Sequence, residues 1–256
     1  MTILSLQNIS AKPWKTLQLS NISLQLAEGE VLGIIGPNGA GKSSLMKLIS
    51  GQIAAASGEL TFLGRAMADW PSRQRACHMS VLPQLSTLSF PYTVNEVVQL
   101  GRIPHATGYQ IDCEIVQEVL VELDISHLSC RLYTELSGGE RQRVQLARVV
   151  AQIWRSEPAL LLLDEPTSAL DLAHQKKLLA TVAALRGRHC AIVMVVHDVN
   201  LLACHATQLL ALRNGRCYAS GTPTQVLTRS LFKEVFDCDV HLTTHPENGQ
   251  PQVMHT

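Results

Sequence analysis

The sequence contains no long apolar run and no excess of charge of either sign. Its longest apolar runs span residues 159–163 and 191–196, far short of the ~20 residues that a membrane-spanning helix needs. Lysine and arginine together number 21, equal to the 21 aspartates and glutamates, so the chain lacks the basic surplus of a dedicated nucleic-acid-binding protein. We therefore expect no membrane span and no nucleic-acid partner.

Cysteine pairs with metal-site spacing are also absent. The seven cysteines include no C-x-x-C pair, so the sequence suggests neither a zinc site nor a disulfide framework. Reduced thiols in a cytosolic protein fit this pattern best. The first nine residues alternate and carry no charge, so we expect no signal peptide. If the protein works at a membrane, a partner must hold it there.

Apolar residues make up 46% of the 256 residues and charged residues only 16%. This composition supports a sizeable core and excludes a mainly disordered chain. Alternating apolar residues predict half-buried strands at 3–9 and 22–26. Continuous apolar runs at 31–35, 159–163 and 191–196 predict strands that are buried on both faces. The sequence therefore predicts a sheet whose central strands are covered on both sides.

Helical periodicity dominates a long middle segment, from about residue 91 to 157, and returns at 172–185 and 200–206. The last residues, from about 241, are polar and rich in Pro, Gly, His and Thr, which predicts a loosely held tail. The chain thus reads as an α/β core interrupted by a helical insertion at about 88–157.

A glycine-rich loop lies between a predicted buried strand and a predicted helix. Residues 36–43 read Gly-Pro-Asn-Gly-Ala-Gly-Lys-Ser and match G-x-x-x-x-G-K-[ST]. The glycines allow backbone N–H groups to point at phosphate oxygens, Lys42 can reach the β- and γ-phosphates, and the Ser43 hydroxyl can hold Mg²⁺. We therefore predict a nucleotide phosphate site here.

Two carboxylates follow the predicted buried strand at 159–163. Asp164 would lie at the carboxyl edge of a parallel sheet, where ligands bind, and could hold the water shell of Mg²⁺ beside Ser43. Glu165 is suited to orient or deprotonate a water aimed at the γ-phosphate. Alone, such a pair could equally be solvated acids after a strand; beside the glycine-rich loop it indicates hydrolysis.

A second anion site is indicated at residues 136–140, Leu-Ser-Gly-Gly-Glu. Ser137 can cap a helix that starts near Arg141, and the two glycines allow close approach to its N-terminus. The natural interpretation is that it serves the γ-phosphate bound by another subunit. The alternative is an ordinary capped helix.

Two further polar residues follow predicted strands. His197 comes after the run 191–196 and could bridge γ-phosphate, water and a neighbouring subunit, although a lone histidine is usually structural. Gln84 follows Val81-Leu82-Pro83, and its amide could sense Mg²⁺ or the attacking water; the alternative is a solvated loop residue.

In this order the motifs resemble the ATP-binding cassette family over about residues 3–235. Residues 36–43 resemble its Walker A, Gln84 its Q-loop and 136–140 its signature motif. Residues 160–165 resemble its Walker B, 168–171 its D-loop and His197 its switch histidine.

The resemblance implies an α/β fold: a P-loop NTPase (RecA-like) core with an N-terminal antiparallel β subdomain and a helical insertion lobe. A single ATPase domain would span about residues 1–240, with core and β subdomain at about 1–87 and 158–240 and the lobe at about 88–157. A polar tail would follow at 241–256.

The resemblance also implies a head-to-tail dimer with two ATPs, each held by the Walker A of one copy and the signature of the other. It implies that Glu165, His197 and Gln84 are catalytic and that Ser43, Gln84 and Asp164 hold Mg²⁺. The implied nucleotide-binding residues are Trp14, Gly36, Pro37, Asn38, Gly39, Ala40, Gly41, Lys42, Ser43, Ser44, Ser137, Gly138, Gly139 and Asp171.

Trp14 is the only aromatic residue before the glycine-rich loop. In the family an early aromatic residue, more often tyrosine, stacks on adenine. The alternative for Trp14 is a tryptophan that packs on the surface.

Shorter matches resemble a subgroup of the family. Residues 101–105, Gly-Arg-Ile-Pro-His, resemble cassettes of iron-siderophore, haem and vitamin B12 importers, and residues 152–156 and 170–175 resemble cassettes of hemin importers in particular. They imply an ATPase peripheral to the cytoplasmic face of a bacterial inner membrane. Its partners would be two membrane-spanning permease subunits, fed by a periplasmic substrate-binding protein.

Other functions stay open at this point. The cargo could be a ferric siderophore or vitamin B12 instead of hemin, or the chain could be a soluble assembly ATPase of iron–sulfur cluster biogenesis. For an importer, we expect the apolar-rich segment 85–104, including Val98, to expose a groove that receives a short helix from the permease.

Overall fold

The computed structural model describes residues 1–12, 19–84, 88–168, 170–246 and 249–255. The chain divides into two compact units. The first consists of Met1–Asp69 and Val193–Thr256, and the second of Trp70–Ile192.

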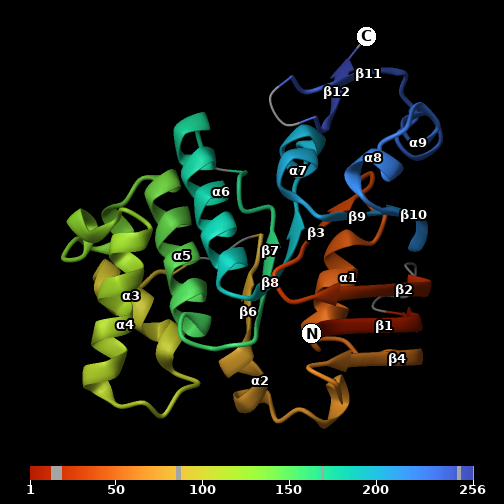
Figure 1. Cartoon of the computed structure of the whole chain (residues 1–256). Helices are drawn as coiled ribbons and strands as arrows, with labels where there is room; N and C mark the ends of the chain where they lie inside the picture. The colour runs from red at the N-terminus through yellow and green to blue at the C-terminus, as the bar shows by residue number, and fades with distance from the viewer. Residues whose placement is uncertain (13–18, 85–87, 169, 247–248, 256) are drawn as a thin grey trace. The chain divides into compact units, whose positions relative to one another are not determined.

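The first unit begins with an antiparallel sheet. Strand β1 (Thr2–Ala11) pairs with β2 (Leu19–Ala27) on one side and with β4 (Ser57–Phe62) on the other, and the short β5 (Arg65–Ala66) extends β4. The three long strands lie side by side in Figure 1. β2 is half-buried, as its alternating pattern predicts.

The prediction of a half-buried strand is wrong for the first part of β1. Residues 3–6 are all buried, including the polar Ser5. Both faces of β1 are covered here, so the alternation Ile-Leu-Ser-Leu does not mark a solvent-facing side. An antiparallel strand often exposes one face to solvent. In this part of β1, the residues on both faces are buried.

The glycine-rich loop of the first unit follows a short strand that is buried throughout. Strand β3 (Val31–Ile35) runs parallel to β9 (Gln208–Arg213), which pairs antiparallel with β10 (Arg216–Gly221), and β10 adjoins β2. All five residues of β3 are buried, as its continuous apolar run predicts. After the loop, helix α1 (Lys42–Ile49) begins.

The C-terminal part of the first unit has more structure than the sequence suggests. After α7 (Val199–His205), α8 (Pro223–Val226) and α9 (Arg229–Val235), strands β11 (Val240–Thr244) and β12 (Pro251–His255) form an antiparallel hairpin. The predicted loosely held tail is therefore wrong. Val240 and Val253 are only 6% and 7% exposed, so one buried valine on each strand anchors the hairpin.

The second unit contains the parallel strand pair β6 (Met79–Leu82) and β7 (Ala159–Asp164), preceded by α2 (Ser72–His78). Every residue of β7 is buried, as predicted. Strand β8 (Cys190–Val195), also buried throughout, starts in this unit and ends in the first.

Helices fill the middle of the second unit. Figure 1 shows α3 (Val94–Gln99), α4 (Tyr109–Glu122) and α5 (Gly138–Ile153) together, and α6 (Leu172–Gly187) follows β7. Short 3₁₀ turns at Leu100–Arg102, Ser126–Leu128 and Tyr133–Glu135 connect them. Their apolar faces form a core of Val94, Val97, Val98, Ile115, Val119 and Val144.

Val98 corrects one expectation from the sequence. It is 0% exposed, so it belongs to the core of the helices and cannot contribute to a docking groove. A charge placed there would be buried without a partner and would destabilise the fold. Within the described residues, no helix has both the length and the apolar character that crossing a membrane requires.

Candidate nucleotide-binding and hydrolysis site

The glycine-rich loop has the backbone shape that its sequence predicts. Gly36 has φ +151°, and a Cβ atom there would lie 2.4 Å from the carbonyl oxygen of Leu212, so no other residue fits. Gly41, with φ +106°, directly precedes α1, which has no side-chain cap. The N–H groups of the first helical turn are therefore suited to bind an anion.

Lys42 is the first residue of α1, directly after the glycines of the loop. Its Nζ donates hydrogen bonds to the carbonyl oxygens of Gly36 (2.7 Å) and Pro37 (3.0 Å), and the residue is 9% exposed. Ser43, the next residue, is exposed and Ser44 is buried. The Lys42 ammonium group is thus held over the loop by the carbonyl oxygens of Gly36 and Pro37. When a phosphate binds, the ammonium group can donate to phosphate oxygens instead.

In the second unit, Asp164 ends the buried strand β7 and is itself 9% exposed. Glu165 then adopts φ +52°, a left-handed conformation that costs a non-glycine residue about 1–2 kcal/mol. The chain therefore turns sharply after the strand. Strained backbone of this kind is found most often at functional sites.

Gln84 and Glu165 are in direct contact. The Gln84 Nε2 atom donates a hydrogen bond to Glu165 Oε2 at 2.8 Å. Leu82 of β6 is paired with Leu163 of β7. Gln84 and Glu165 each lie two residues beyond this pair. This confirms that both lie at the carboxyl edge of the strand pair, and it shows a bond that the sequence did not predict.

The signature motif forms the N-terminus of α5. Ser137 Oγ accepts a hydrogen bond from the backbone N–H of Glu140 (3.3 Å), and the Ser137 N–H donates to Glu140 Oε2 (2.8 Å). The predicted cap is confirmed, although the helix starts at Gly138 instead of near Arg141. The hydrogen bond from the Ser137 backbone is the main cause that lowers the pKa of Glu140.

Nothing within the described chain requires glycine at position 138. A Cβ atom on Gly138 would have no heavy atom within 4 Å, and its φ is not positive. Gly36 is different, because the fold itself excludes a side chain there. A requirement for glycine at 138 would therefore come from a molecule that approaches this helix end from outside.

Asp171 has a local role that the sequence did not reveal. It caps α6: its Oδ1 accepts a hydrogen bond from the His174 backbone N–H (2.8 Å) and lies 2.7 Å from His174 Nδ1. The hydrogen bond from the His174 backbone is the main cause that lowers the pKa of Asp171. The signal was available, since an acidic residue directly before a helical pattern is a common N-cap.

His197 lies just beyond the end of β8, as predicted, and is exposed. The next residue, Asp198, caps α7 by accepting hydrogen bonds from the N–H groups of Asn200 (2.9 Å) and Leu201 (3.2 Å). The histidine thus lies between a buried strand and a capped helix, which limits its backbone freedom.

The predicted site residues are divided between the two units. The glycine-rich loop and His197 belong to the first unit, whereas Gln84, the signature motif, the two carboxylates after β7 and Asp171 belong to the second. Within the second unit the structure brings Gln84 and Glu165 together. Trp14 and Ala169 of the D-loop lie outside the described residues.

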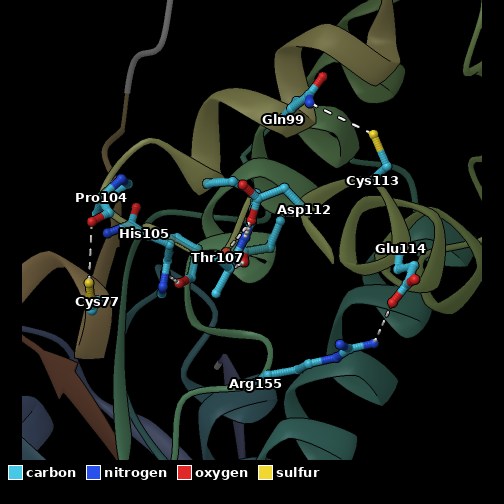
Figure 2. Close-up of polar contacts among 12 residues, drawn as sticks. Cys77, Gln99, Pro104, His105, Thr107, Asp112, Cys113, Glu114 and Arg155 are labelled. Atoms are coloured by element: carbon cyan, nitrogen blue, oxygen red, sulfur yellow. Dashed lines mark hydrogen bonds and ion pairs between the residues drawn. The ribbon is translucent and has the colours of Figure 1, made fainter. Parts of the chain in front are cut away.

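Sequence reasoning missed a polar network around Arg102, which Figure 2 shows in part. The Arg102 side chain is 3% exposed and donates to Asp112 Oδ1 (2.9 Å), the Ala151 carbonyl (2.7 Å) and Thr107 Oγ1 (3.3 Å). Thr107 also donates to Asp112. A buried guanidinium needs such partners, so the network fixes the segment after α3.

A neighbouring contact joins two of the three short segments that marked the importer subgroup. The His105 Nε2 atom lies 2.6 Å from the Gln152 carbonyl oxygen, and burial is the main cause that lowers the pKa of His105. A Cβ atom on Gly101 would lie 2.1 Å from the Arg148 carbonyl oxygen. Residues 101–105 and 152–156 are therefore neighbours in space at the end of α5.

Sequence comparisons agree with these observations. Residues 19–168 match the family model described as ABC transporter. The hemin import ATP-binding protein HmuV of Pseudomonas entomophila is 46% identical over 98% of this chain and 99% of its own. The protein of the same name from Gloeobacter violaceus is 46% identical over 92% of this chain and 88% of its own.

Solved structures show the same fold. A metal-chelate type ABC transporter in an inward-facing conformation has a TM-score of 0.83 and 26% identity, covering 99% of this chain and 96% of its own. An ATP-binding cassette in the ADP conformation has a TM-score of 0.78 at 23% identity, covering 93% and 98%. The α/β fold and P-loop ATPase class predicted from the sequence are confirmed. The chain belongs to the ABC transporter family, as one of its ATP-binding, ATP-hydrolysing subunits.

Proposed function

We propose that this chain is the ATPase subunit of a bacterial hemin importer, bound at the cytoplasmic face of the inner membrane by two permease subunits. The observation that carries this proposal is the 46% identity to a hemin import ATP-binding protein across 98% of the chain. The contact between His105 and the Gln152 carbonyl supports it, because it joins two of the segments that resemble this importer subgroup.

The proposed reaction uses two copies in head-to-tail arrangement. Each ATP would be bound by the glycine-rich loop of one copy and by Ser137, Gly138 and Gly139 of the other. The open space around Gly138 supports this arrangement, because a ligand on a second copy would explain glycine where the fold does not.

Hydrolysis would use the groups at the strand ends. We propose that Glu165 accepts a proton from the attacking water and that His197 contacts the γ-phosphate. Gln84, Ser43 and Asp164 offer amide, hydroxyl and carboxylate oxygens, the donor set that suits Mg²⁺. When bound, Mg²⁺ supplies positive charge to the β- and γ-phosphates. The hydrogen bond that Gln84 Nε2 donates to Glu165 orients the Glu165 carboxylate.

Substituting Ser137 tests the head-to-tail arrangement. We expect Ser137→Arg to lower ATP hydrolysis by at least about 100-fold, because a large side chain at the mouth of α5 would block the other copy's γ-phosphate. ATP binding to the variant alone should stay normal, since Lys42 belongs to the other unit. Hydrolysis rates and size-exclusion chromatography with Mg-ATP measure both effects.

Ser137→Ala is the matched control, because it also removes the cap, at a cost of about 1 kcal/mol, but adds no bulk. It should lower hydrolysis far less than Ser137→Arg does, because it removes the hydroxyl without filling the space at the helix end. Mixing Ser137→Arg with Lys42→Ala chains should leave at most one usable site per heterodimer. Full ATP-dependent dimerisation of Ser137→Arg alone would contradict the arrangement.

The proposed permease contact uses exposed apolar residues of the segment after Gln84. Phe90 is 67% exposed, Tyr92 39% and Ile103 70%, and the Phe90 and Tyr92 ring centroids lie 6.2 Å apart. A short helix of the permease could cover these side chains. They take the place of Val98, which is buried.

Charge at these positions should uncouple the ATPase from its partner. We expect Phe90→Glu and Ile103→Glu to leave hydrolysis by the isolated chain near normal and to lower permease-stimulated hydrolysis and hemin uptake by at least about 10-fold. Val121→Glu is the matched control, since Val121 is equally apolar, 69% exposed and lies on α4 outside this segment. Uptake that stays normal in both variants would exclude this contact.

The cargo is tested with the complete transporter. The chain should co-purify with a polytopic membrane protein; soluble partners would instead favour an assembly ATPase. Vesicles that contain this complex, supplied with the periplasmic binding protein, should take up hemin in preference to a ferric siderophore or vitamin B12. Preference for either alternative would overturn the cargo assignment and leave the ATPase assignment intact.

A further inference from the structure

The side chain of Asn200 forms hydrogen bonds between the helix that follows His197 and the C-terminal hairpin. Asn200 Nδ2 donates a hydrogen bond to the Val253 carbonyl oxygen (2.9 Å), and the Val253 N–H donates to Asn200 Oδ1 (2.7 Å). The side-chain amide thus brackets one backbone residue of β12, making the pair of hydrogen bonds that a neighbouring strand would otherwise make.

This bracket lies close to His197 along the chain. Asn200 is in the first turn of α7, and its own N–H is bonded to the Asp198 cap. From His197 to Asn200 there are only three steps, with Asp198 fixed by its two hydrogen bonds to the helix. A shift of the first turn of α7 would therefore move the His197 backbone.

Helix α7 needs external support to hold that position. It has seven residues, too few for a helix that is stable by itself. Leu202 and Ala203 are 0% exposed and anchor its second half. The Asn200 bracket anchors its first turn, the part nearest to His197.

The hairpin also borders the space beside His197. The wall of a cavity of about 420 Å³ includes His197 and Asp198 together with Phe232, Phe236, Cys238 and Val253. The two phenylalanine rings stack at 5.5 Å. Without β12 in place, this wall would open, and the histidine would gain room to turn away from a nucleotide.

We infer that Asn200 is a positioning residue for hydrolysis: by bracketing Val253 it fixes the first turn of α7 to the C-terminal hairpin and so holds His197 in its working position. The inference rests on the role proposed above for His197. It gives the C-terminal segment, which the sequence left as a tail, a part in the ATPase cycle.

Asn200→Ala in the full-length chain should lower kcat for ATP hydrolysis by between about 10- and 100-fold, the cost of misplacing a group that touches the reacting phosphate. KM for ATP should stay within about 2-fold, because Lys42 and its loop are not part of the bracket. Hydrogen exchange of the amides of residues 252–254 should become faster, which shows that the hairpin has loosened.

Val253→Pro tests the same bond from the other side. It removes the N–H that donates to Asn200 Oδ1 but keeps Asn200 itself. β12 already starts with Pro251, two residues earlier and hence on the same side of the strand, so proline is compatible with this edge. Val253→Ala keeps the N–H but removes part of the buried side chain, so as the control it should retain more of kcat than Val253→Pro.

Combining the substitution with His197→Ala separates positioning from general loosening. In single-turnover measurements, Asn200→Ala should cause no further loss in the His197→Ala background, because both changes remove the same interaction. An additive loss, an equal loss of ATP affinity, or wild-type kcat despite a loosened hairpin would each overturn the inference. Wild-type turnover of His197→Ala alone would overturn the role of His197 as well.

Discussion

Replacing Glu165 with glutamine should slow ATP hydrolysis by about 10²–10⁴-fold while ATP binding stays unchanged. Glutamine has nearly the same size and shape as glutamate, but its amide cannot accept the proton of the attacking water. The change therefore removes the proposed base and little else.

The contact with Gln84 makes this substitution unusually specific. Gln84 donates to Glu165 Oε2, and the amide oxygen of a glutamine at position 165 can accept the same hydrogen bond. Glu165→Ala, in contrast, removes both the base and the bond. Comparing the two variants separates the loss of proton transfer from the loss of the Gln84 contact.

Without hydrolysis, two ATP molecules should remain trapped in a closed dimer of Glu165→Gln chains. Phosphate release measures turnover, and size-exclusion chromatography with Mg-ATP measures the dimer. Turnover at the wild-type rate would contradict the role of Glu165 as the base, and a monomer with bound ATP would contradict the closed dimer.

Lys42→Ala should weaken ATP binding by about 10- to 100-fold, since a hydrogen bond from a charged group contributes about 1.5–3 kcal/mol. In the structure its ammonium group bonds to the Gly36 and Pro37 carbonyls. A bound phosphate would take over those bonds, and alanine can offer none. Fluorescent-nucleotide titration measures the affinity.

Lys47→Ala is the matched control for charge on the same helix. Lys47 lies in the last turn of α1, so its removal changes the net charge equally but not the loop. Its ATP affinity should stay within about 2-fold of wild type. Unchanged affinity of Lys42→Ala would contradict the assignment of the glycine-rich loop as the phosphate site.

The parts of the fold that the sequence predicted correctly depend on short-range patterns. Strands β3, β7 and β8 are continuous apolar runs, and all are buried throughout. The Ser137 cap follows from residues only three positions apart. Such features are decided locally, so a single sequence is sufficient to find them.

Other features depend on contacts between distant segments, which no local pattern sets. The bond between Gln84 and Glu165 joins residues 81 positions apart and depends on the register of β6 and β7. Val98 is buried because α3 packs against other helices, although its segment has more apolar residues than one helix face needs. The C-terminal hairpin is held by Val240, Val253 and Asn200, of which Asn200 lies 53 positions from its partner Val253.

The close approach of Gly101 to α5 restricts which residues can change between related chains. A side chain at position 101 would collide with the Arg148 carbonyl, and Arg102 is bonded to the Ala151 carbonyl, 49 positions away. Both contacts are made to backbone carbonyl oxygens, which any helical sequence supplies, so the constraint falls on residues 101 and 102 and not on the side chains of α5. For this contact, residues 148 and 151 can vary between related chains, whereas Gly101 and Arg102 have to be retained.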